Sequence, residues 1–286
     1  MTWLLRLFGA LPLPLNHALG AALAYLLWWP SARHRELTRA NVNRYVNFCN
    51  APAAPRGVIG EQGKSLTELT LAWSASLPKV LALIKDCEGW AHVEAAQAAG
   101  RPIIFVTPHL GCYDIAGRYV AQRTPITALY RPPKLKWLEP LMQEGRARGG
   151  ASTAPADASG VRALLKTLKA GGSIMILPDQ VPGVGDGVWA DFFGTPAYTM
   201  TLLPRLALST NAVVLFFFGE RLPSGKGYRI HVVPMTETYS AQKEIAARQT
   251  NAMVEKLIVM APAQYLWGYN RYKQPAGAPP SPSRNK

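Results

Sequence analysis

From residue 102 onward, short apolar runs alternate with amphipathic stretches along the chain. Ile103-Ile104-Phe105-Val106 is an unbroken apolar run of the length expected for a buried strand. Similar runs predict strands at 126–129, 174–177, 213–218 and 229–233, and helical patterns predict helices at 114–122, 136–148, 159–170, 202–209 and 241–259. Strands that alternate with helices indicate βαβ units. We therefore predict an α/β domain with a mostly parallel sheet flanked by helices.

Residues 33–99 are predicted to be helical, because apolar side chains recur there at three- and four-residue steps. The recurring positions are Leu66, Leu69, Trp73, Leu77, Val80, Leu81 and Ile84. Pro52 and Pro55 interrupt the chain before this pattern. The region therefore reads as a helical segment that precedes the first strand.

Residues 2–29 are mostly apolar but do not make a continuous membrane-spanning sequence. The interruptions are Arg6, Pro12, Pro14, Asn16 and His17. The unbroken run Ala18–Trp29 has 12 residues, fewer than the roughly 20 that span a bilayer core. Trp28-Trp29-Pro30 is a poor cleavage site for a signal peptidase.

The end of this apolar segment has the composition of an interfacial membrane anchor. Aromatic residues come first and cations follow: Tyr25, Trp28, Trp29, Arg33, Arg35 and Arg39. The alternative is a helical hairpin in the core of a soluble domain, and we favour the anchor. We expect an N-terminal helical membrane-anchoring extension at 1–30, an α/β domain at 31–274 and a disordered Pro/Ser/basic tail at 275–286. The cations after the anchor place the domain on the cytoplasmic face of the membrane.

The chain is strongly basic, with 31 Lys and Arg against 17 Asp and Glu among 286 residues, a net charge of +14. An anionic membrane surface, an acidic protein or a phosphorylated substrate would suit this charge. No RNA-binding or helix-turn-helix signature is present, so nucleic acid is not predicted as a partner. The three cysteines are far apart, which indicates neither a disulfide framework nor a zinc site, and no metal site is predicted.

The most informative segment, residues 107–114, follows directly on the first predicted strand and reads Thr-Pro-His-Leu-Gly-Cys-Tyr-Asp. With His109 in the loop and Asp114 in the first turn of the next helix, the carboxylate could bend back to Nδ1 of the imidazole. That would leave Nε2 free to accept a proton. No serine or cysteine is obviously paired with His109, which suggests that it activates a substrate hydroxyl directly. A structural histidine at a strand end is the alternative.

Two more polar segments follow predicted strands. They are Tyr130-Arg131-Pro132-Pro133-Lys134 and Leu177-Pro178-Asp179-Gln180. Ligands of open α/β sheets bind at the carboxyl ends of the strands, so His109, Arg131 and Asp179 could converge there. Arg131 suits a phosphate, with a surface salt bridge as the alternative. Asp179 could orient Arg131 or hold the loop, or it could be only a turn residue after Pro178.

Together with the blocks at 191–197 (Asp-Phe-Phe-Gly-Thr-Pro-Ala) and 263–267 (Ala-Gln-Tyr-Leu-Trp), these motifs resemble the bacterial lipid A late acyltransferases of the lauroyl and myristoyl type. That family belongs to the glycerolipid acyltransferase superfamily, and the likeness extends to about Lys273. By this resemblance His109 would be the general base and Asp114 its partner. Arg131, with Tyr130, would contact substrate phosphate, and Asp179 with Gln180 would form a corner of the site. No cofactor is implied.

The sequence departs from the family pattern in two places. Many members have Glu at the position of Asp114, within an aromatic-rich His-Phe-Gly-Asn-Trp-Glu motif. Their C-terminal segment often reads Tyr-x-Trp-x-His-Arg-Arg, whereas residues 265–271 here read Tyr-Leu-Trp-Gly-Tyr-Asn-Arg. These departures bear on chain length and acceptor choice rather than on the reaction class.

The resemblance implies transfer of a fatty acyl chain from an acyl-carrier-protein thioester to a hydroxyl of a lipid A precursor in lipopolysaccharide biosynthesis, at the inner membrane. Within the same class, the acceptor could be another bacterial lipid. A non-enzymatic basic protein that binds membranes or nucleic acid is the alternative from another class. His17, His34, His92 and His231 match no motif and are interpreted as surface or satisfied core residues. Alternating glycines within Val181–Val188 favour a flexible substrate loop over a phosphate cradle, because no helix is predicted after them.

Overall fold

The computed structural model describes residues 2–130, 137, 139–147 and 150–282. Its helices, in chain order, are α1 (Thr2–Ala10), α2 (Leu13–Trp28), α3 (Ala32–Cys49), α4 (Val58–Ser74), α5 (Leu77–Ala82), α6 (Ala91–Ala98), α7 (Tyr113–Arg123), α8 (Glu139–Ala147), α9 (Ala158–Lys169), α10 (Leu202–Thr210) and α11 (Lys243–Met260), with short 3₁₀ helices η2 (Pro223–Gly225) and η3 (Pro262–Gln264). Its strands are β1 (Ile84–Glu88), β2 (Ile103–Val106), β3 (Ile126–Tyr130), β4 (Ala151–Pro155), β5 (Ser173–Ile176), β6 (Gly187–Phe192), β7 (Thr195–Met200), β8 (Val213–Arg221) and β9 (Tyr228–Pro234).

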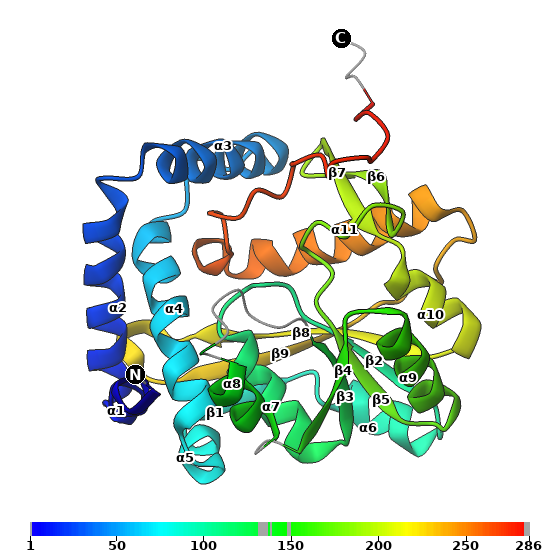
Figure 1. Cartoon of the computed structure of the whole chain (residues 1–286), viewed down its shortest axis with the longest axis horizontal. Helices are drawn as coiled ribbons and strands as arrows, with labels where there is room; N and C mark the ends of the chain where they lie inside the picture. Colours follow the sequence, from blue (N-terminus) through cyan, green and yellow to red (C-terminus); the bar gives the residue numbers. More distant parts are fainter. Residues whose placement is uncertain (1, 131–136, 138, 148–149, 283–286) are drawn as a thin grey trace.

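In the described part of the chain, a seven-stranded sheet has the order β1-β9-β8-β2-β5-β3-β4 (Figure 1). Every neighbouring pair is parallel except β8 and β9, which are antiparallel. The predicted α/β fold with a mostly parallel sheet flanked by helices is confirmed. Because β2, β3, β5 and β8 run in the same direction, the loops after them emerge at one edge of the sheet.

The side chains of β2 alternate between two helical layers. Ile104 and Val106 belong to a buried cluster with apolar residues of α9, α10 and α11. Ile103 and Phe105 belong to another cluster with residues of α6 and α7. Since a strand that is covered on both faces has no solvent-facing side, it reads as an unbroken apolar run rather than an alternating pattern. This is why the β2 prediction had the correct boundaries.

Four strands, β1, β4, β6 and β7, were not predicted from the sequence. Ile84 continues the helical spacing of the preceding segment but begins β1, so the prediction of helix throughout 33–99 was wrong there. Strands β1 and β4 lie at the two ends of the strand order, and both carry polar side chains. Edge strands bury less apolar surface than central ones, so their hydrophobic pattern is weak.

Strands β6 and β7 form a separate two-stranded hairpin that packs on α11. Phe192 pairs with Thr195, so Phe193 and Gly194 make a two-residue turn, with φ values of 47° and 65°. Left-handed values at both positions define the type I′ turn that fits the twist of a hairpin. The glycine pattern at 183–187 leads through a turn directly into β6.

The described end of the tail, residues 275–282, contacts this hairpin, which differs from the expected disorder. Ala278 is buried in a small cluster with Val181 and Tyr198. The indole Nε1 of Trp189 donates to Pro279 O at 2.9 Å. The composition of the tail suggested disorder because proline and serine do not build a core of their own. The tail can still pack against a surface that other residues form.

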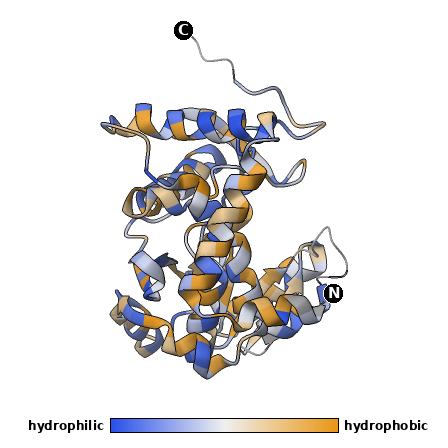
Figure 2. Cartoon of the chain, turned by 90° about the vertical axis from the view of Figure 1, so that its left-hand side faces the viewer, coloured by the Kyte–Doolittle hydropathy of each residue, from blue (hydrophilic) through white to orange (hydrophobic). Residues whose placement is uncertain are grey.

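The N-terminal helices α1 and α2 pack along α4 rather than extending away from the domain (Figure 1). Leu13, Asn16, His17 and Gly20 form the buried face of α2. Its outer face is apolar and exposed, and Figure 2 shows α2 largely in hydrophobic colours beneath the more polar α3. Across the described ranges, no helix is both long and apolar enough to cross a bilayer. The segment thus combines features of both alternatives, a packed inner face and an exposed apolar outer face.

Candidate active site

His109 lies in the loop between β2 and α7, and its imidazole is held by Asp179, which follows β5. Nδ1 of His109 is 2.8 Å from Asp179 Oδ1, and the backbone N–H of His109 donates to Asp179 Oδ2, also at 2.8 Å. One carboxylate therefore fixes both the ring and the backbone of the same residue. The Asp179 side chain is 3% exposed and that of His109 is 14% exposed, so the carboxylate is buried and the ring reaches the surface of the site.

The expectation that Asp114 would meet Nδ1 of His109 was wrong, because Asp179 occupies that position. The reason is the strand register. Val106 of β2 pairs with Ile176 of the adjacent parallel strand β5, and His109 and Asp179 each lie three residues beyond these partners. Asp114 lies in the first turn of α7, where it lines a small cavity with residues that include Arg118 and Met175.

The electrostatic setting keeps Asp179 ionised. Burial alone would raise the pKa of Asp179, but the charge of His109 and its two hydrogen bonds hold that pKa below the ordinary value. Burial, followed by the charge and hydrogen bond of Asp179, raises the pKa of Tyr265 well above its ordinary value. An ionised carboxylate only accepts hydrogen bonds, so Nδ1 of His109 carries a proton, and in the neutral imidazole Nε2 carries the lone pair. This tautomer is the one that a general base requires.

Gln180 lies at Nε2 of the ring, and Tyr113 packs against the imidazole. The side-chain Nε2 of Gln180 lies 3.1 Å from Nε2 of His109, where the amide donates to the ring lone pair. The Tyr113 ring meets the imidazole edge-on, with centroids 5.0 Å apart. A substrate hydroxyl that approaches the base must therefore take the place of the Gln180 amide.

The remaining predicted site residues are placed as follows. Tyr130 ends β3 and is buried, and its hydroxyl donates to Glu139 Oε1 at 3.2 Å. Arg131 lies outside the described residues, so its predicted convergence with His109 stays a prediction. The structure thus brings together His109, Asp179 and Gln180 from two adjacent strand ends.

The C-terminal segment supports the loop that carries His109, a role that the sequence did not suggest. Leu266 N–H donates to His109 O at 3.1 Å, and Gly111 N–H donates to Gln264 O at 3.2 Å. Leu110 and Tyr265 form an antiparallel bridge. The Ala-Gln-Tyr-Leu-Trp block therefore acts as a short strap along the loop at 109–111. Its presence among the family motifs was the only signal that pointed to it.

Arg271 is a second residue that the sequence left without a role. It is 2% exposed, and its guanidinium donates to Tyr198 O, Thr199 Oγ1 and Asn251 Oδ1. Burial lowers the pKa of Arg271, while nearby Tyr265 and Asp179 act in the opposite direction. The buried cation joins β7 to α11 and contributes to the positive field at Asp179.

The Phe-Phe-Gly motif at 192–194 is structural rather than part of the site. Phe193 is buried, and its backbone N–H donates to Glu255 Oε1 at 2.7 Å. Arg248 holds Glu255 with two hydrogen bonds, at 3.0 and 2.6 Å. These contacts fix the type I′ turn against α11.

Neither a thiol nucleophile nor a metal centre accompanies the histidine in the described part of the chain. Cys112 is buried, and burial raises the pKa of its thiol well above the ordinary value. Across residues 2–130, 137, 139–147 and 150–282, His, Cys, Asp and Glu form no group of three that could hold a metal ion. The arrangement suits direct proton abstraction from a substrate hydroxyl by Nε2 of His109.

Comparison with known proteins decides the family. The sequence model of the bacterial lipid A biosynthesis acyltransferases matches residues 1–274. The chain belongs to this family. It is therefore an acyltransferase, and the resemblance found from the motifs is confirmed.

Individual relatives agree with this membership. The chain is 28% identical over 292 aligned positions to the lipid A biosynthesis lauroyltransferase of Escherichia coli K12, covering 98% of this chain and 94% of that protein. It is 28% identical to the palmitoleoyltransferase of the same organism, covering 97% and 92%. A lipid A biosynthesis acyltransferase of Haemophilus influenzae is 31% identical over 63% of this chain and 56% of its own length.

Proposed function

We propose that this acyltransferase moves a fatty acyl chain from an acyl-carrier-protein thioester to a hydroxyl of a lipid A precursor, in lipopolysaccharide biosynthesis. The observation that carries the proposal is the His109 imidazole, oriented by the buried Asp179 with Nε2 directed away from it. The printed names of the relatives, which are lipid A lauroyl- and palmitoleoyltransferases, support the acceptor class. The net charge of +14 suits both an acidic carrier protein and a phosphorylated lipid.

The tautomer of His109 with its proton on Nδ1 allows Nε2 to act as the base in the reaction. Nε2 of His109 takes the proton of the acceptor hydroxyl as its oxygen attacks the thioester carbonyl. Asp179 stabilises the imidazolium that forms without becoming protonated itself. When the tetrahedral intermediate collapses, the C–S bond breaks and the imidazolium returns its proton to the leaving thiolate. The products are the acyl ester and the free carrier thiol, and the histidine is regenerated.

The backbone of residues 109–112 does not supply donors for the oxyanion that forms in this step. Each of its N–H groups already donates within the protein: His109 to Asp179, Leu110 to Pro108 O, Gly111 to Gln264 O and Cys112 to Gly219 O. We assign this role to side chains instead. The Gln180 amide lies beside the base, and Arg131 is the proposed contact to the oxyanion or to substrate phosphate, with Tyr130 next to it.

We place the protein on the cytoplasmic face of the inner membrane through the outer face of α1 and α2. The most exposed apolar side chains there are Trp3, Leu7, Leu26 and Trp29. Arg33 and Arg39 are exposed in the first half of α3, where they suit anionic headgroups. An aromatic and apolar face followed by cations is typical of a helix that lies in the membrane interface.

Another bacterial lipid is the second candidate acceptor. The geometry of the site supports acyl transfer to a hydroxyl, but it does not select which lipid carries that hydroxyl. The experiment uses a deletion strain complemented with this gene, followed by mass spectrometry of its lipid A. We expect one added acyl chain with the wild-type gene. A change in another lipid, with lipid A unmodified, would favour the second candidate.

His109→Ala should reduce acyl transfer by about two to four orders of magnitude without unfolding the protein, because a positioned base is lost. His92→Ala is the matched control, since His92 is exposed on α6. Near-full activity in a folded His109→Ala protein would contradict the proposed mechanism.

A further inference from the structure

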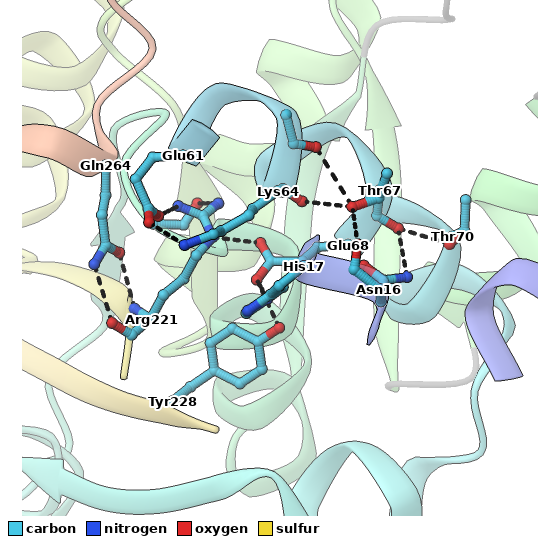
Figure 3. A network of polar contacts seen from close by, with 12 residues as sticks. Asn16, His17, Glu61, Lys64, Thr67, Glu68, Thr70, Arg221, Tyr228 and Gln264 are labelled. Atoms are coloured by element: carbon cyan, nitrogen blue, oxygen red, sulfur yellow. Dashed lines mark hydrogen bonds and ion pairs between the residues drawn. The ribbon is translucent and has the colours of Figure 1, made fainter. Parts of the chain in front are cut away.

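A buried cluster of charged side chains lies next to the catalytic loop and plays no part in the proposed chemistry. His17 of α2, Glu68 of α4, Arg221 of β8 and Tyr228 of β9 meet there, and each is at most 6% exposed (Figure 3). The cluster joins the N-terminal helices to the sheet. Ionised groups in such a place are costly unless each is paired and hydrogen-bonded.

Glu68 is the centre of the cluster. Its Oε1 is 2.6 Å from Nε2 of His17 and accepts from the Tyr228 hydroxyl at 2.7 Å, and its Oε2 accepts from Arg221 Nε at 2.8 Å. Burial would raise the pKa of Glu68, but Arg221 and these hydrogen bonds hold that pKa below its ordinary value. Glu68 is therefore a carboxylate, and its charge holds the guanidinium in place.

The guanidinium of Arg221 reaches the catalytic loop with its remaining nitrogens. Nη2 donates to Gly111 O at 2.9 Å, and Nη1 lies 3.4 Å from Glu61 Oε2. The backbone of Arg221 is fixed too, because its N–H donates to Gln264 Oε1 at 2.8 Å and its carbonyl accepts from Gln264 Nε2 at 3.0 Å. The same Gln264 accepts from Gly111 N–H through its carbonyl.

Gly111 fixes the loop that carries His109, because its backbone is in close contact with neighbouring segments. It lies two residues after His109, has a left-handed φ of 58°, and a Cβ at this position would collide with Gly219 O of β8. Its N–H faces the C-terminal strap and its carbonyl faces Arg221. The path from the cluster to the base is thus a single hydrogen bond followed by two residues of constrained backbone.

We propose that Arg221 is a positioning residue for His109, and that its hydrogen bond to Gly111 O sets the loop conformation in which His109 meets Asp179. The inference rests on the proposed function, since it assigns no new reaction. Arg221 touches no substrate in this arrangement, so its removal should lower kcat and leave the KM of donor and acceptor unchanged. A misplacement of about 1 Å at a reacting group can cost about a hundredfold in rate.

Two substitutions separate this role from a contribution to stability alone. Arg221→Met keeps the apolar stem but removes every donor, and Glu68→Gln removes the counter-charge but leaves the donor to Gly111 O. The single Arg221→Met protein buries the Glu68 carboxylate without its guanidinium counter-charge and should be the less stable. The double variant Glu68→Gln/Arg221→Met buries no charge at this point, so its thermal stability should recover relative to Arg221→Met.

The proposal predicts that kcat and thermal stability change independently among these three variants. In the double variant, kcat should stay about ten- to a hundredfold below wild type although stability recovers. Glu68→Gln alone should keep much more of kcat than either variant that lacks Arg221. Arg248→Gln is the matched control, because it breaks a partly buried ion pair with Glu255 at the hairpin and should leave kcat unchanged.

A readout without turnover accompanies the kinetics. The Nδ1–H proton of His109, hydrogen-bonded to a carboxylate, should give a far-downfield proton NMR resonance. We expect this resonance to shift or broaden in both variants that lack Arg221 and to persist in Arg248→Gln. Recovery of kcat and of the resonance in the double variant would overturn the proposal. Failure of wild-type protein to transfer an acyl chain would instead contradict the proposed function, and the resonance would still test the positioning of His109.

Discussion

At the scale of single residues, the site depends on which of two aspartates meets the imidazole. Asp114 is close to His109 in sequence, whereas Asp179 is 70 residues away and binds both the ring and the backbone of His109. A carboxylate that holds two groups of one residue restricts that residue more than a single hydrogen bond does. The histidine is therefore oriented across two strands rather than within one loop.

Asp179→Asn should reduce kcat by up to about 10⁴-fold, because an amide of the same shape can stabilise the wrong imidazole tautomer. Asp114→Asn should cost less, since Asp179 would still fix Nδ1. The measurement is kcat with an acyl-carrier-protein thioester, with circular dichroism to show that both proteins are folded. A larger loss for Asp114→Asn would return the orienting role to Asp114.

The lowered pKa of Asp179 also predicts how stability depends on pH. The folded protein binds this proton less readily than the unfolded chain, in which the pKa of Asp is about 3.9. The contribution of the ionised group is complete above that value and is lost as the pH falls through the folded pKa. Within that window it gives a slope of up to about 1.4 kcal/mol per pH unit in the free energy of unfolding.

Urea unfolding at several pH values between about 2 and 5 should therefore show a shallower slope for Asp179→Asn than for wild type. Asp186→Asn is a suitable control, because Asp186 is exposed in the turn before β6. Equal slopes in wild type and Asp179→Asn would mean that Asp179 has no lowered pKa in the folded protein.

At the scale of elements, the contact between α2 and α4 is made by small residues that let the two backbones approach closely. A Cβ at Gly63 would collide with Gly20 O and lie 2.6 Å from the Ala24 side chain. Thr67 adds a hydrogen bond from its hydroxyl to Asn16 O at 3.2 Å. The helices are therefore matched to each other, and α2 is part of the domain core on this side.

Gly63→Ala should destabilise the protein by roughly 1–3 kcal/mol, the usual cost of forcing extra volume into a packed contact. Gly60→Ala in the same helix is the matched control, because its Cβ would meet its nearest neighbour, Ala21 Cβ, at 3.4 Å. The gain in helix propensity should leave Gly60→Ala neutral or slightly stabilised. Equal thermal midpoints for the two variants would show that α2 and α4 do not pack this closely.

At the scale of the whole molecule, the inner face of α1 and α2 packs against the domain, and the outer face is the proposed membrane contact. The inner face carries His17 into the buried cluster, so removal of residues 2–29 would take away the His17 partner of Glu68 and expose the apolar side of α4. We expect that truncated protein to aggregate rather than to become a soluble enzyme. Substitutions on the outer face should avoid this, because the side chains there are exposed.

Leu26→Ser, Leu27→Ser and Trp29→Ser combined should reduce binding to anionic vesicles at least about tenfold while the fold is kept, since each apolar side chain contributes roughly 1.5–3 kcal/mol when fully buried. The matched control replaces three similarly apolar exposed residues elsewhere, Leu208, Ile245 and Val259. Vesicle flotation at high salt measures the difference. Equal loss of binding in the two triple variants would place the membrane contact elsewhere.

The sequence by itself determined the elements that are buried on both sides and the residue types of the site. The apolar run of β2, the helical pattern of α9 and the polar residues that follow β2 and β5 were all found from local pattern. Such features depend on the periodicity of side chains along a single strand or helix. The family motifs then gave the reaction class.

Only the tertiary structure decided which of these residues meet. The register between β2 and β5 places Asp179 at His109, and the crossing of α2, α4 and β8 assembles Glu68 and Arg221 behind Gly111. These pairings join residues 70 and 153 positions apart. Local pattern carries no information about contacts of that separation, because strand order and helix crossing arise when the layers pack together.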